Sequence, residues 1–285
     1  MTNNKDTWLQ DYACNHNSQT GEDGIIEKIL EVIGDTSGWC VEFGAWDGKY
    51  FSNTFELIRN KGYRAVLIEG ADDRFHDLVK TFSGNDRVIP MHALVGFGIE
   101  DNLDKLLSTT EIPEDFDVLS IDIDGNDYHV WKSTTRYRPK VVVIEYNPTI
   151  PSAVEFVQPA DMNINQGSSI LSLYNLGKEK GYELVSATDL NCIFVDGRYY
   201  EKFGIRNNSV GTLRPNESMV TYIFNGYDGT VFFSGYGKLG WHLLPYQDYK
   251  LQQLPGWLRQ FPDNYSPFKA RIAKFYRKMR KRRIL

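Results

Sequence analysis

Residues 22–196 alternate between helical apolar patterns and short β-branched runs, and this alternation is the strongest constraint on the fold. The run at 140–147 is apolar at nearly every position, so both of its faces must be covered. Strands separated by helices predict a mostly parallel sheet with helices on both faces. The tight TDLN connection before the last strand predicts an antiparallel end to the sheet. The seven expected strands are WCVEFGA (39–45), RAVLIEG (64–70), VIPMHALV (88–95), DVLSIDID (117–124), KVVVIEYN (140–147), YELVSAT (182–188) and NCIFVD (191–196).

The composition is that of an ordinary globular protein, with 41% hydrophobic and 24% charged residues among 285. The opening MTNNKDTWLQDY lacks the basic and apolar regions of a signal peptide, and no apolar run approaches the ~20 residues that cross a bilayer. Cys14, Cys40 and Cys192 lie far apart and never in C-x-x-C spacing. This pattern favours a reducing compartment without a thiolate metal site, so we expect a cytoplasmic protein.

Composition divides the chain into four segments. An N-terminal arm (1–21) precedes the alternating domain (22–196), and an aromatic appendage (197–268) and a basic tail (269–285) follow it. Within the appendage, MVTYIFNGYDGTVFFSGY predicts a β-hairpin that turns around residues 225–229. We therefore expect one catalytic or binding domain with an attached hairpin and a C-terminal helix.

The basic tail differs sharply in charge from the rest of the chain. It holds nine Lys or Arg residues and no acid, so residues 1–268 carry −14 while the whole chain carries −5. An acidic body of this kind predicts no nucleic-acid partner. Two alternatives fit the tail: an amphipathic helix on an anionic membrane leaflet, at the inner membrane face, or a helix docked on the acidic body. Its apolar residues at helical spacing are Phe268, Ile272, Phe275, Tyr276 and Met279.

The stretch VEFGAWDG (41–48) ends the first predicted strand with Gly44 and Gly48. The dinucleotide fingerprint G-x-G-x-x-G requires a small residue where this chain has Trp46, and Glu42 at the strand end repels phosphates. A P-loop would further require Gly-Lys-Ser/Thr, which this turn does not contain. The turn therefore argues against both nucleotide classes. The plainer alternative is a tight bend that binds nothing.

An uncharged or cationic ligand fits this turn better, and S-adenosylmethionine carries a sulfonium cation and no phosphate. Glu69 ends the second strand, where a carboxylate can accept the two hydroxyls of a ribose. Ser52 and Asn53 are expected to cap a helix that begins at Ser52 and whose N-terminus would receive the cofactor carboxylate. The predicted cofactor-binding residues are Glu42, Gly44, Ala45, Asp47, Gly48, Asn53, Glu69, Gly70 and Asp122.

Several motifs, taken together and in order, resemble a bacterial branch of the FkbM-type methyltransferases. The resemblance implies a Rossmann-like class I S-adenosylmethionine-dependent methyltransferase, which usually acts on a hydroxyl of a saccharide or related natural product. It spans about residues 18–196, leaves 197–285 outside the family pattern and does not specify the acceptor. The motifs that carry it are SQTGEDGIIEKIL (18–30), VEFGAWDGKYFSNTFELI (41–58), LIEG (67–70), DVLSIDIDGNDYHVW (117–131), VVVIEYNPTIP (141–151) and QGSSILSL (166–173).

Acids also gather at the ends of the fourth and fifth predicted strands. Asp122 and Asp124 lie two residues apart on one strand, so we expect them to share a face, and Glu145 and Asn147 should do the same. If the two strands are neighbours, these oxygen ligands converge where a methyl acceptor would lie. Hard oxygen ligands suit Mg²⁺, so all four residues are predicted metal ligands.

A sugar hydroxyl needs to lose its proton before it attacks a methyl group, so a base is expected beside the acceptor. Asp122, Asp124 and His129 are the predicted catalytic residues. The alternative is that residues 124–127 form only a turn and a helix cap, with Glu145 contacting the cofactor or a backbone amide. His129 has aromatic neighbours that also fit a packed or surface histidine. Gln19, Glu22 and Asp23 precede the first helix, in a loop that either closes over the cofactor or, through Ser18 and Glu22, simply caps that helix.

These predictions combine into an S-adenosylmethionine-dependent O-methyltransferase with Mg²⁺ as a second cofactor. Its expected acceptor is a small molecule or glycan, such as a surface-polysaccharide precursor. The alternative from another class is a non-catalytic protein that binds S-adenosylmethionine or a sugar nucleotide. A nicotinamide oxidoreductase on the same sheet is disfavoured by Trp46. Nothing in the sequence specifies the oligomeric state.

Overall fold

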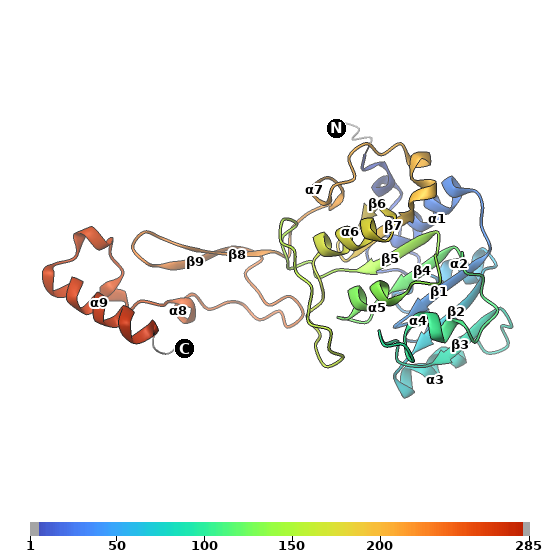
Figure 1. Cartoon of the computed structure of the whole chain (residues 1–285), viewed down its shortest axis with the longest axis horizontal. Coiled ribbons are helices and arrows are strands. Elements are labelled where there is room, and N and C mark those ends of the chain that lie inside the picture. Colours follow the sequence, from blue (N-terminus) through green and yellow to red (C-terminus); the bar gives the residue numbers. More distant parts are fainter. Residues whose placement is uncertain (1–5, 282–285) are drawn as a thin grey trace. The chain divides into compact units, whose positions relative to one another are not determined.

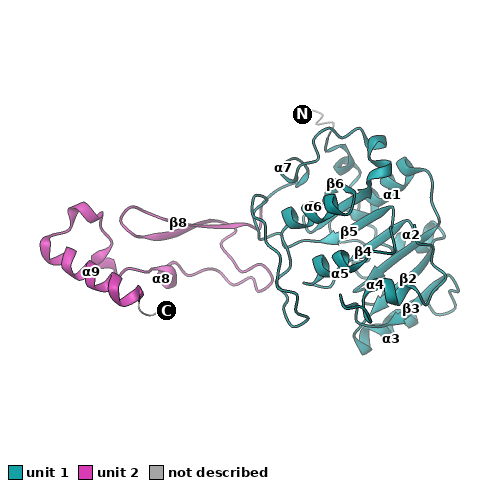
Figure 2. Ribbon diagram, in the orientation of Figure 1, with its two compact units in different colours: residues 1–217 teal, residues 218–285 magenta. Residues whose placement is uncertain are grey.

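The computed structural model describes residues 6–281 and divides the chain into two compact units, residues 1–217 and 218–285 (Figures 1 and 2). Unit 1 contains a seven-stranded sheet in the order β3-β2-β1-β4-β5-β7-β6. Every pairing is parallel except those of β7, which runs antiparallel to both β5 and β6. The predicted Rossmann-like α/β fold with an antiparallel end is confirmed. The strands are β1 (Trp39–Phe43), β2 (Arg64–Glu69), β3 (Val88–His92), β4 (Val118–Ile121), β5 (Val141–Glu145), β6 (Tyr182–Ala187) and β7 (Asn191–Asp196).

Helices cover both faces of this sheet, as the apolar run in β5 predicts (Figure 1). Side chains alternate along each strand, so Val142 and Ile144 face one buried cluster while Val141 and Val143 face the other. Helices α1, α2 and α3 contribute to the second cluster, and α4, α5 and α6 to the first. The helical elements of unit 1 are η1 (Trp8–Tyr12), α1 (Glu22–Ile33), α2 (Phe55–Asn60), α3 (Asp72–Thr81), α4 (Leu103–Leu107), α5 (Asp127–Ser133), α6 (Ile170–Glu179), η2 (Gly197–Phe203) and α7 (Val210–Leu213).

Six of the seven strands end earlier than predicted, and at β4 and β5 this changes how the acids are presented. β4 ends at Ile121, so the prediction that Asp122 and Asp124 share a strand face is wrong. β5 ends at Glu145, which leaves Asn147 in the following loop. In both places the sequence pattern does not mark the last residue that pairs with the neighbouring strand. Hydrogen bonds to the backbone of the following loop decide where the strand pairing stops.

Unit 2 consists of a hairpin and a set of short helices that ends in a longer one. The predicted hairpin is confirmed: β8 (Thr221–Asn225) pairs antiparallel with β9 (Val231–Gly235). After it come α8 (Asp248–Leu251), η3 (Gly256–Leu258), η4 (Pro262–Asn264) and α9 (Pro267–Lys281). Within residues 6–281 no helix combines the length and apolar character needed to cross a membrane.

The division between the units differs from the predicted boundary at residue 197. Residues 197–217 belong to unit 1, where Phe203 and Ile205 enter one buried cluster and Val210 and Leu213 the other. The predicted appendage and tail, from Ser218 onward, form one unit. The sequence predicts a boundary at 197 because residues 197–209 are mostly polar. The few apolar residues among them give no periodic pattern that would mark them as buried in unit 1.

A buried ion pair joins the residues that directly precede β4 and β5. Lys140 Nζ lies 3.0 Å from Asp117 Oδ1 and also donates to the carbonyl of Asp35 at 2.7 Å. The Asp117 carboxylate further accepts the backbone N–H groups of Ser37 and Gly38. Both side chains of the pair are almost completely buried, so the loss of either partner leaves an uncompensated charge.

We expect Asp117→Ala to lower the free energy of unfolding by about 3–5 kcal/mol, because the buried Lys140 ammonium loses its counter-ion. The matched control is Glu114→Ala, which breaks an exposed pair with Arg136 and should change stability by less than about 1 kcal/mol. Urea unfolding of the two full-length variants measures the difference. Equal effects of the two substitutions would contradict the claim that the buried Asp117–Lys140 pair matters more for stability than an exposed pair.

Candidate active site

The carboxyl ends of four neighbouring parallel strands carry the predicted site residues to one edge of the sheet. β1 lies between β2 and β4, so the chain order reverses here, and folds of this kind bind ligands beyond the strand ends at such a point. Glu69 ends β2, Gly44 follows β1, Asp122 follows β4 and Glu145 ends β5. The topology thus brings both sequence constellations to the same edge.

Gly44 is required by a close approach between two strand ends. It has φ +70°, and a Cβ atom there would lie 1.8 Å from the backbone oxygen of Asp122. Gly48 has φ +72° and packs against Leu78 and Phe82 of the α3 region, where a Cβ atom would also clash. Both glycines therefore have backbone and packing reasons that hold with or without a ligand.

The turn between these glycines is held by Glu69. One carboxylate oxygen of Glu69 accepts the Trp46 backbone N–H and the other accepts that of Ala71, both at 2.8 Å. Trp46 itself is in the left-handed region with φ 51°, an uncommon conformation for a bulky residue. Its ring is 42% exposed and lies under the Arg74 guanidinium, 3.9 Å from the ring centroid. Glu69 therefore fixes the turn while each of its oxygens keeps a lone pair for another donor.

Glu42 is engaged by the loop before α2, and its predicted contact with a cofactor stays a prediction. Its carboxylate is 5% exposed and accepts hydrogen bonds from Ser52 Oγ, Thr54 Oγ1 and the Asn53 backbone N–H. Burial raises its pKa, although these hydrogen bonds act in the opposite direction. Glu42 thus holds the loop before α2 in place.

The loop before α2 also differs from the prediction in where the helix starts. α2 begins at Phe55 rather than Ser52 and its N-cap is Thr54, so Ser52 lies in the loop before the helix, where its Oγ accepts the Phe55 N–H at 3.0 Å. Asn53 caps nothing and donates to Ser120 Oγ instead. Asp47 accepts the backbone N–H groups of Lys49 and Tyr50 and so closes the turn that leads into this loop.

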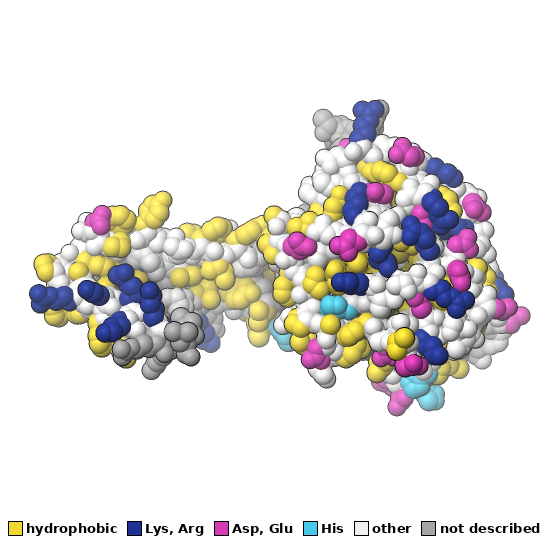
Figure 3. Space-filling view, in the orientation of Figure 1, with side chains coloured by type: hydrophobic (Ala, Val, Ile, Leu, Met, Phe, Trp, Pro, Cys, Tyr) yellow, Lys and Arg dark blue, Asp and Glu magenta, His cyan; other side chains and the backbone are white. Residues whose placement is uncertain are grey.

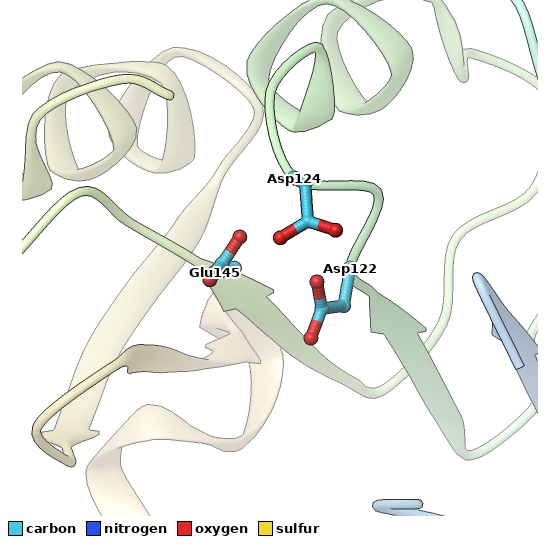
Figure 4. Close-up of side chains that lie close together, drawn as sticks. All are labelled: Asp122, Asp124 and Glu145. Atoms are coloured by element: carbon cyan, nitrogen blue, oxygen red, sulfur yellow. The ribbon is translucent and has the colours of Figure 1, made fainter. Parts of the chain in front are cut away.

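Three carboxylates converge between the ends of β4 and β5 (Figure 4). Asp122, Asp124 and Glu145 each offer an oxygen, and these oxygens lie within 4.8 Å of one another. Figure 4 shows Asp122 at the end of β4, Glu145 at the end of β5 and Asp124 reaching toward them from the loop before α5. The predicted convergence of these three side chains is therefore present, although two of them stand on a loop.

Crowding of like charges perturbs this cluster strongly. Burial, followed by the charges of Asp127 and Asp124, raises the pKa of Asp122 from 3.8 to about 8. Burial and the neighbouring Asp122 raise the pKa of Glu145 well above its ordinary range. The cluster therefore has a high affinity for protons, and the same crowding would favour a bound cation.

Asp127 is the residue that builds this cluster and that the sequence interpretation did not single out. Its carboxylate accepts the backbone N–H groups of Ile123 and Gly125, both at 2.9 Å. Between them Asp124 adopts φ 56°, a left-handed conformation that turns its side chain out of the path of β4. Burial raises the pKa of Asp127 to about 6. Residues 124–127 form the predicted turn and helix start, and the acid cluster is also present. The sequence left the turn and the cluster open as alternatives, and the structure contains both.

The segment 148–168 packs directly on this turn. A Cβ atom on Gly125 would lie 3.0–3.2 Å from Ile164, Asn165 and the Gln158 side chain. Gln158 is 1% exposed and organises the segment: its oxygen accepts the N–H groups of Gln166 and Gly167, and its amide donates to Ile164. A buried glutamine in a polar loop gives no sequence signal that separates it from its exposed neighbours.

Two predicted residues are engaged by this same segment. His129 places Nε2 2.8 Å from the Gln158 carbonyl, so that nitrogen carries the proton and donates it. Asn147 donates to the Gln166 carbonyl and accepts from the Thr149 N–H and hydroxyl. Its amide therefore fixes the loop beside the acids, and the polar atoms of Asn147 are already paired.

The start of the segment is held by Arg214, which is 7% exposed. Its guanidinium donates to the carbonyls of Pro148 and Ile150 at 2.6 and 2.8 Å. Backbone carbonyls presented to a buried cation make a rigid clamp, so residues 148–152 are held on the sheet by a residue far along the chain.

Glu22 and Asp23 hold the N-terminal loop in place through hydrogen bonds. Glu22 is completely buried and accepts hydrogen bonds from Thr188 Oγ1 and Asn191 Nδ2, at 2.6 and 2.9 Å. Burial alone would raise its pKa, but the hydrogen bonds outweigh burial and lower it. Asp23 Oδ2 accepts three consecutive backbone N–H groups at 16–18. Together they tie the N-terminal loop to the β6–β7 turn.

Comparisons with known proteins find likeness only among solved structures. No family model matches the chain, and no curated protein matches it in sequence. The solved N-terminal domain of EvdMO1 with SAH bound is 13% identical, with 62% of this chain and 80% of that chain covered and a TM-score of 0.41. A SAM-dependent methyltransferase from Aquifex aeolicus is 10% identical, with 66% and 96% covered and a TM-score of 0.38. M. jannaschii TYW2 in complex with AdoMet is 17% identical, with 62% and 78% covered and a TM-score of 0.36.

We expect Gly44→Ala to lower the free energy of unfolding by about 3 kcal/mol or more, because the new methyl group collides with the Asp122 carbonyl. Gly38→Ala is the matched control: its φ is +73° but nothing lies within 4 Å of a Cβ atom, so only the backbone penalty of about 1 kcal/mol remains. Thermal unfolding distinguishes the two. Similar losses would show that the β1 and β4 ends are not in tight contact.

The raised pKa of Asp122 predicts a pH-dependent cost to stability. From pH 3.8 to about 8 the folded chain retains a proton that the unfolded chain releases, so stability falls as pH rises through this window. Asp122→Asn should therefore raise the melting temperature near pH 8 by a few degrees, roughly 2–4 °C per kcal/mol, and change it little below pH 4. Measurements in a chelator keep divalent ions out. Asp77→Asn, an exposed change on α3, is the control; no gain for Asp122→Asn near pH 8 would contradict the electrostatic account.

Proposed function

We propose that this protein is an FkbM-type S-adenosylmethionine-dependent O-methyltransferase. The proposed acceptor is a hydroxyl of a saccharide or related surface-polysaccharide or natural-product precursor. The single observation that carries the proposal is the common position of Glu69 and the acid cluster, on opposite sides of Gly44 at one sheet edge. One side suits a ribose-bearing cofactor, and the other suits a hydroxyl that must lose a proton.

The residues around Gly44 fit S-adenosylmethionine by their chemistry. Glu69 is anchored by two backbone N–H groups, so its remaining lone pairs are held ready for the two ribose hydroxyls. No Lys or Arg occurs between Glu42 and Gly48, as expected for a ligand without phosphates. The nearby acids at 122 and 145 favour a cationic sulfonium. S-adenosylmethionine supplies a methyl group on positively charged sulfur, which makes that carbon electrophilic.

The proposed transfer joins these two sides. The acceptor oxygen attacks the methyl carbon, the O–C bond forms as the C–S bond breaks, and the electron pair stays on sulfur to give S-adenosylhomocysteine. The hydroxyl proton passes to an ionised carboxylate of the acid cluster; Asp122, whose pKa is raised to about 8, accepts it only in its deprotonated form. The reaction also requires the acceptor oxygen, the methyl carbon and the sulfur to lie in a line. Gly44 and the anchored turn favour this alignment because they fix the ends of β1 and β4 together.

A divalent cation is the second part of the proposal. Asp122, Asp124 and Glu145 would hold it, because three carboxylate oxygens within 4.8 Å suit a hard ion that keeps several waters. Such an ion would lower the pKa of a bound hydroxyl. Asn147 was predicted as a fourth ligand, but its amide is paired within the 148–168 segment, so we leave it out of the proposed ligand set.

The cation can be tested without a turnover assay. In wild-type protein, Mg²⁺ should raise the melting temperature near pH 8 because it relieves the repulsion among the acids. Asp124→Asn should remove most of this gain, whereas Asp77→Asn should keep it. If Mg²⁺, Mn²⁺ and Ca²⁺ leave the melting temperature of the wild type unchanged, the cluster works as a carboxylate base alone.

The cofactor site predicts a clear loss of affinity in Glu69→Gln, which exchanges one hydroxyl-accepting oxygen for an amide donor. S-adenosylhomocysteine should bind roughly 10- to 100-fold more weakly, since a hydrogen bond to a charged group contributes about 1.5–3 kcal/mol. Isothermal titration of the full-length protein measures this. Asp77→Asn, on α3 directly after the same strand, removes an exposed carboxylate and should bind as wild type does.

Two outcomes separate the alternatives. If wild type binds S-adenosylhomocysteine but releases none from S-adenosylmethionine with any hydroxylated acceptor, the non-catalytic binding protein is favoured. If Glu69→Gln binds with wild-type affinity, the proposed cofactor position is wrong. A melting-temperature match between Glu69→Gln and wild type is the check that a weaker affinity does not reflect unfolding.

A further inference from the structure

Unit 2 exposes more apolar surface than its folding requires. In the described chain, six large apolar side chains of unit 2 that precede α9 are each at least 59% exposed. Isolated exposed side chains are ordinary, but this many in one small unit indicate a surface that meets an apolar partner. Figure 3 shows yellow side chains along the hairpin and dark blue ones over α9. The six are Ile223, Tyr227, Trp241, Leu243, Leu244 and Tyr249.

Helix α9 has its own exposed apolar stripe. Phe268, Phe275 and Met279 lie at helical spacings of seven and four residues, so they share one side of the helix, and they are 73%, 64% and 47% exposed. The helix meets its own unit through another side: Ala270, Ala273 and Arg277 line a cavity of about 690 Å³ together with residues of the preceding loop. The stripe is therefore not the surface that attaches α9 to unit 2.

Cations border this stripe. Seven Lys or Arg residues and no acid occur between Lys269 and Lys281. On a helix of 3.6 residues per turn, Arg271 and Lys278 fall on one flank of the stripe. On the other side Lys269 donates to Gln260 and Arg280 lines the cavity, so that side faces unit 2 itself. Long basic side chains beside an apolar stripe are the pattern of helices that lie in the interface of a bilayer.

We propose that unit 2 docks on the surface of an anionic lipid bilayer, with α9 lying in the plane of the interface. Phe268, Phe275 and Met279 enter the boundary between headgroups and acyl chains, and the flanking cations contact lipid phosphates. The exposed tyrosine and tryptophan side chains of unit 2 have amphipathic rings, which favour the headgroup region of a bilayer. Docking does not depend on methyl transfer, so it stands or falls separately from the proposed function.

A bilayer fits these residues better than a nucleic acid does. Nucleic acids would use the cations and could stack on the aromatic rings, but they have no use for the exposed aliphatic Ile223, Leu243 and Leu244. A bilayer uses all three kinds of side chain at once: cations at the phosphates, rings at the interface and aliphatic groups below it. The occupant that accounts for the whole surface is therefore lipid.

Flotation of the full-length protein with vesicles tests the proposal. Vesicles of phosphatidylcholine mixed with about one-third phosphatidylglycerol should carry the protein, and pure phosphatidylcholine should carry much less. Phe268→Ser/Phe275→Ser should weaken partitioning by about tenfold or more, because two exposed rings lose their apolar depth. Val79→Ser/Ile99→Ser, two exposed apolar residues of unit 1, is the matched control and should float as wild type does.

The charge contribution has its own matched pair of variants. Arg271→Gln/Lys274→Gln/Lys278→Gln should weaken partitioning by on the order of 100-fold at low salt, since each of the three cations near an anionic surface contributes a factor of about five. Lys80→Gln/Lys105→Gln/Lys132→Gln removes three exposed charges from unit 1 and should have little effect. High salt should reduce binding of wild type toward that of the α9 charge variant.

Three results would overturn the proposal. The first is no flotation of wild type with anionic vesicles at low salt. The second is flotation that Phe268→Ser/Phe275→Ser leaves unchanged, which would leave only a non-specific charge effect. The third is tight binding to an oligonucleotide that the α9 charge variant loses, together with no vesicle binding, which would assign the surface to nucleic acid.

Discussion

The end of β1 lies directly against the end of β4, and the candidate site depends on that contact. Gly44 is the position that allows it, because any side chain there would overlap the Asp122 carbonyl. The contact places the turn after β1 beside the acids after β4, with β2 on the other side. Glu69 then secures the same turn through the backbone N–H of Trp46. The proposed cofactor side and the proposed acceptor side are thus two ends of one short stretch of backbone.

The electrostatics of the site oppose folding. Asp122, Asp124, Asp127 and Glu145 crowd four acids into a partly buried place, and burial and mutual repulsion raise the pKa of three of them. Without a ligand this arrangement costs stability, and hydrogen bonds from backbone N–H groups to Asp127 offset part of the cost. Costs of this kind concentrate at functional sites, where a proton, a cation or a reacting group removes them.

Much of the fold follows from the sequence, and the exceptions have physical causes. The alternation of strands and helices predicted all seven strands and the antiparallel end, because burial on both faces leaves an apolar signature that local context rarely disguises. Strand ends were predicted too long at Asp122 and Asn147, since loop hydrogen bonds rather than residue type end the ladder there. The convergence of Asp122, Asp124 and Glu145 was predicted correctly. One reason given for it was wrong, because Asp122 and Asp124 follow β4 and do not share a face of that strand. The structural tasks of Glu42, Gln158 and Arg214 depend on partners that no spacing rule identifies.

The central claim is that one sheet edge holds both an S-adenosyl cofactor and a proton-accepting acid cluster. A crystal structure of the full chain with S-adenosylhomocysteine and Mg²⁺ tests it most directly. The account predicts the ribose hydroxyls on Glu69, the ligand beside Gly44, and the homocysteine sulfur facing Asp122, Asp124 and Glu145, with any ion bound among those three carboxylates. A ligand bound elsewhere, or a ribose that makes no contact with Glu69, would contradict it.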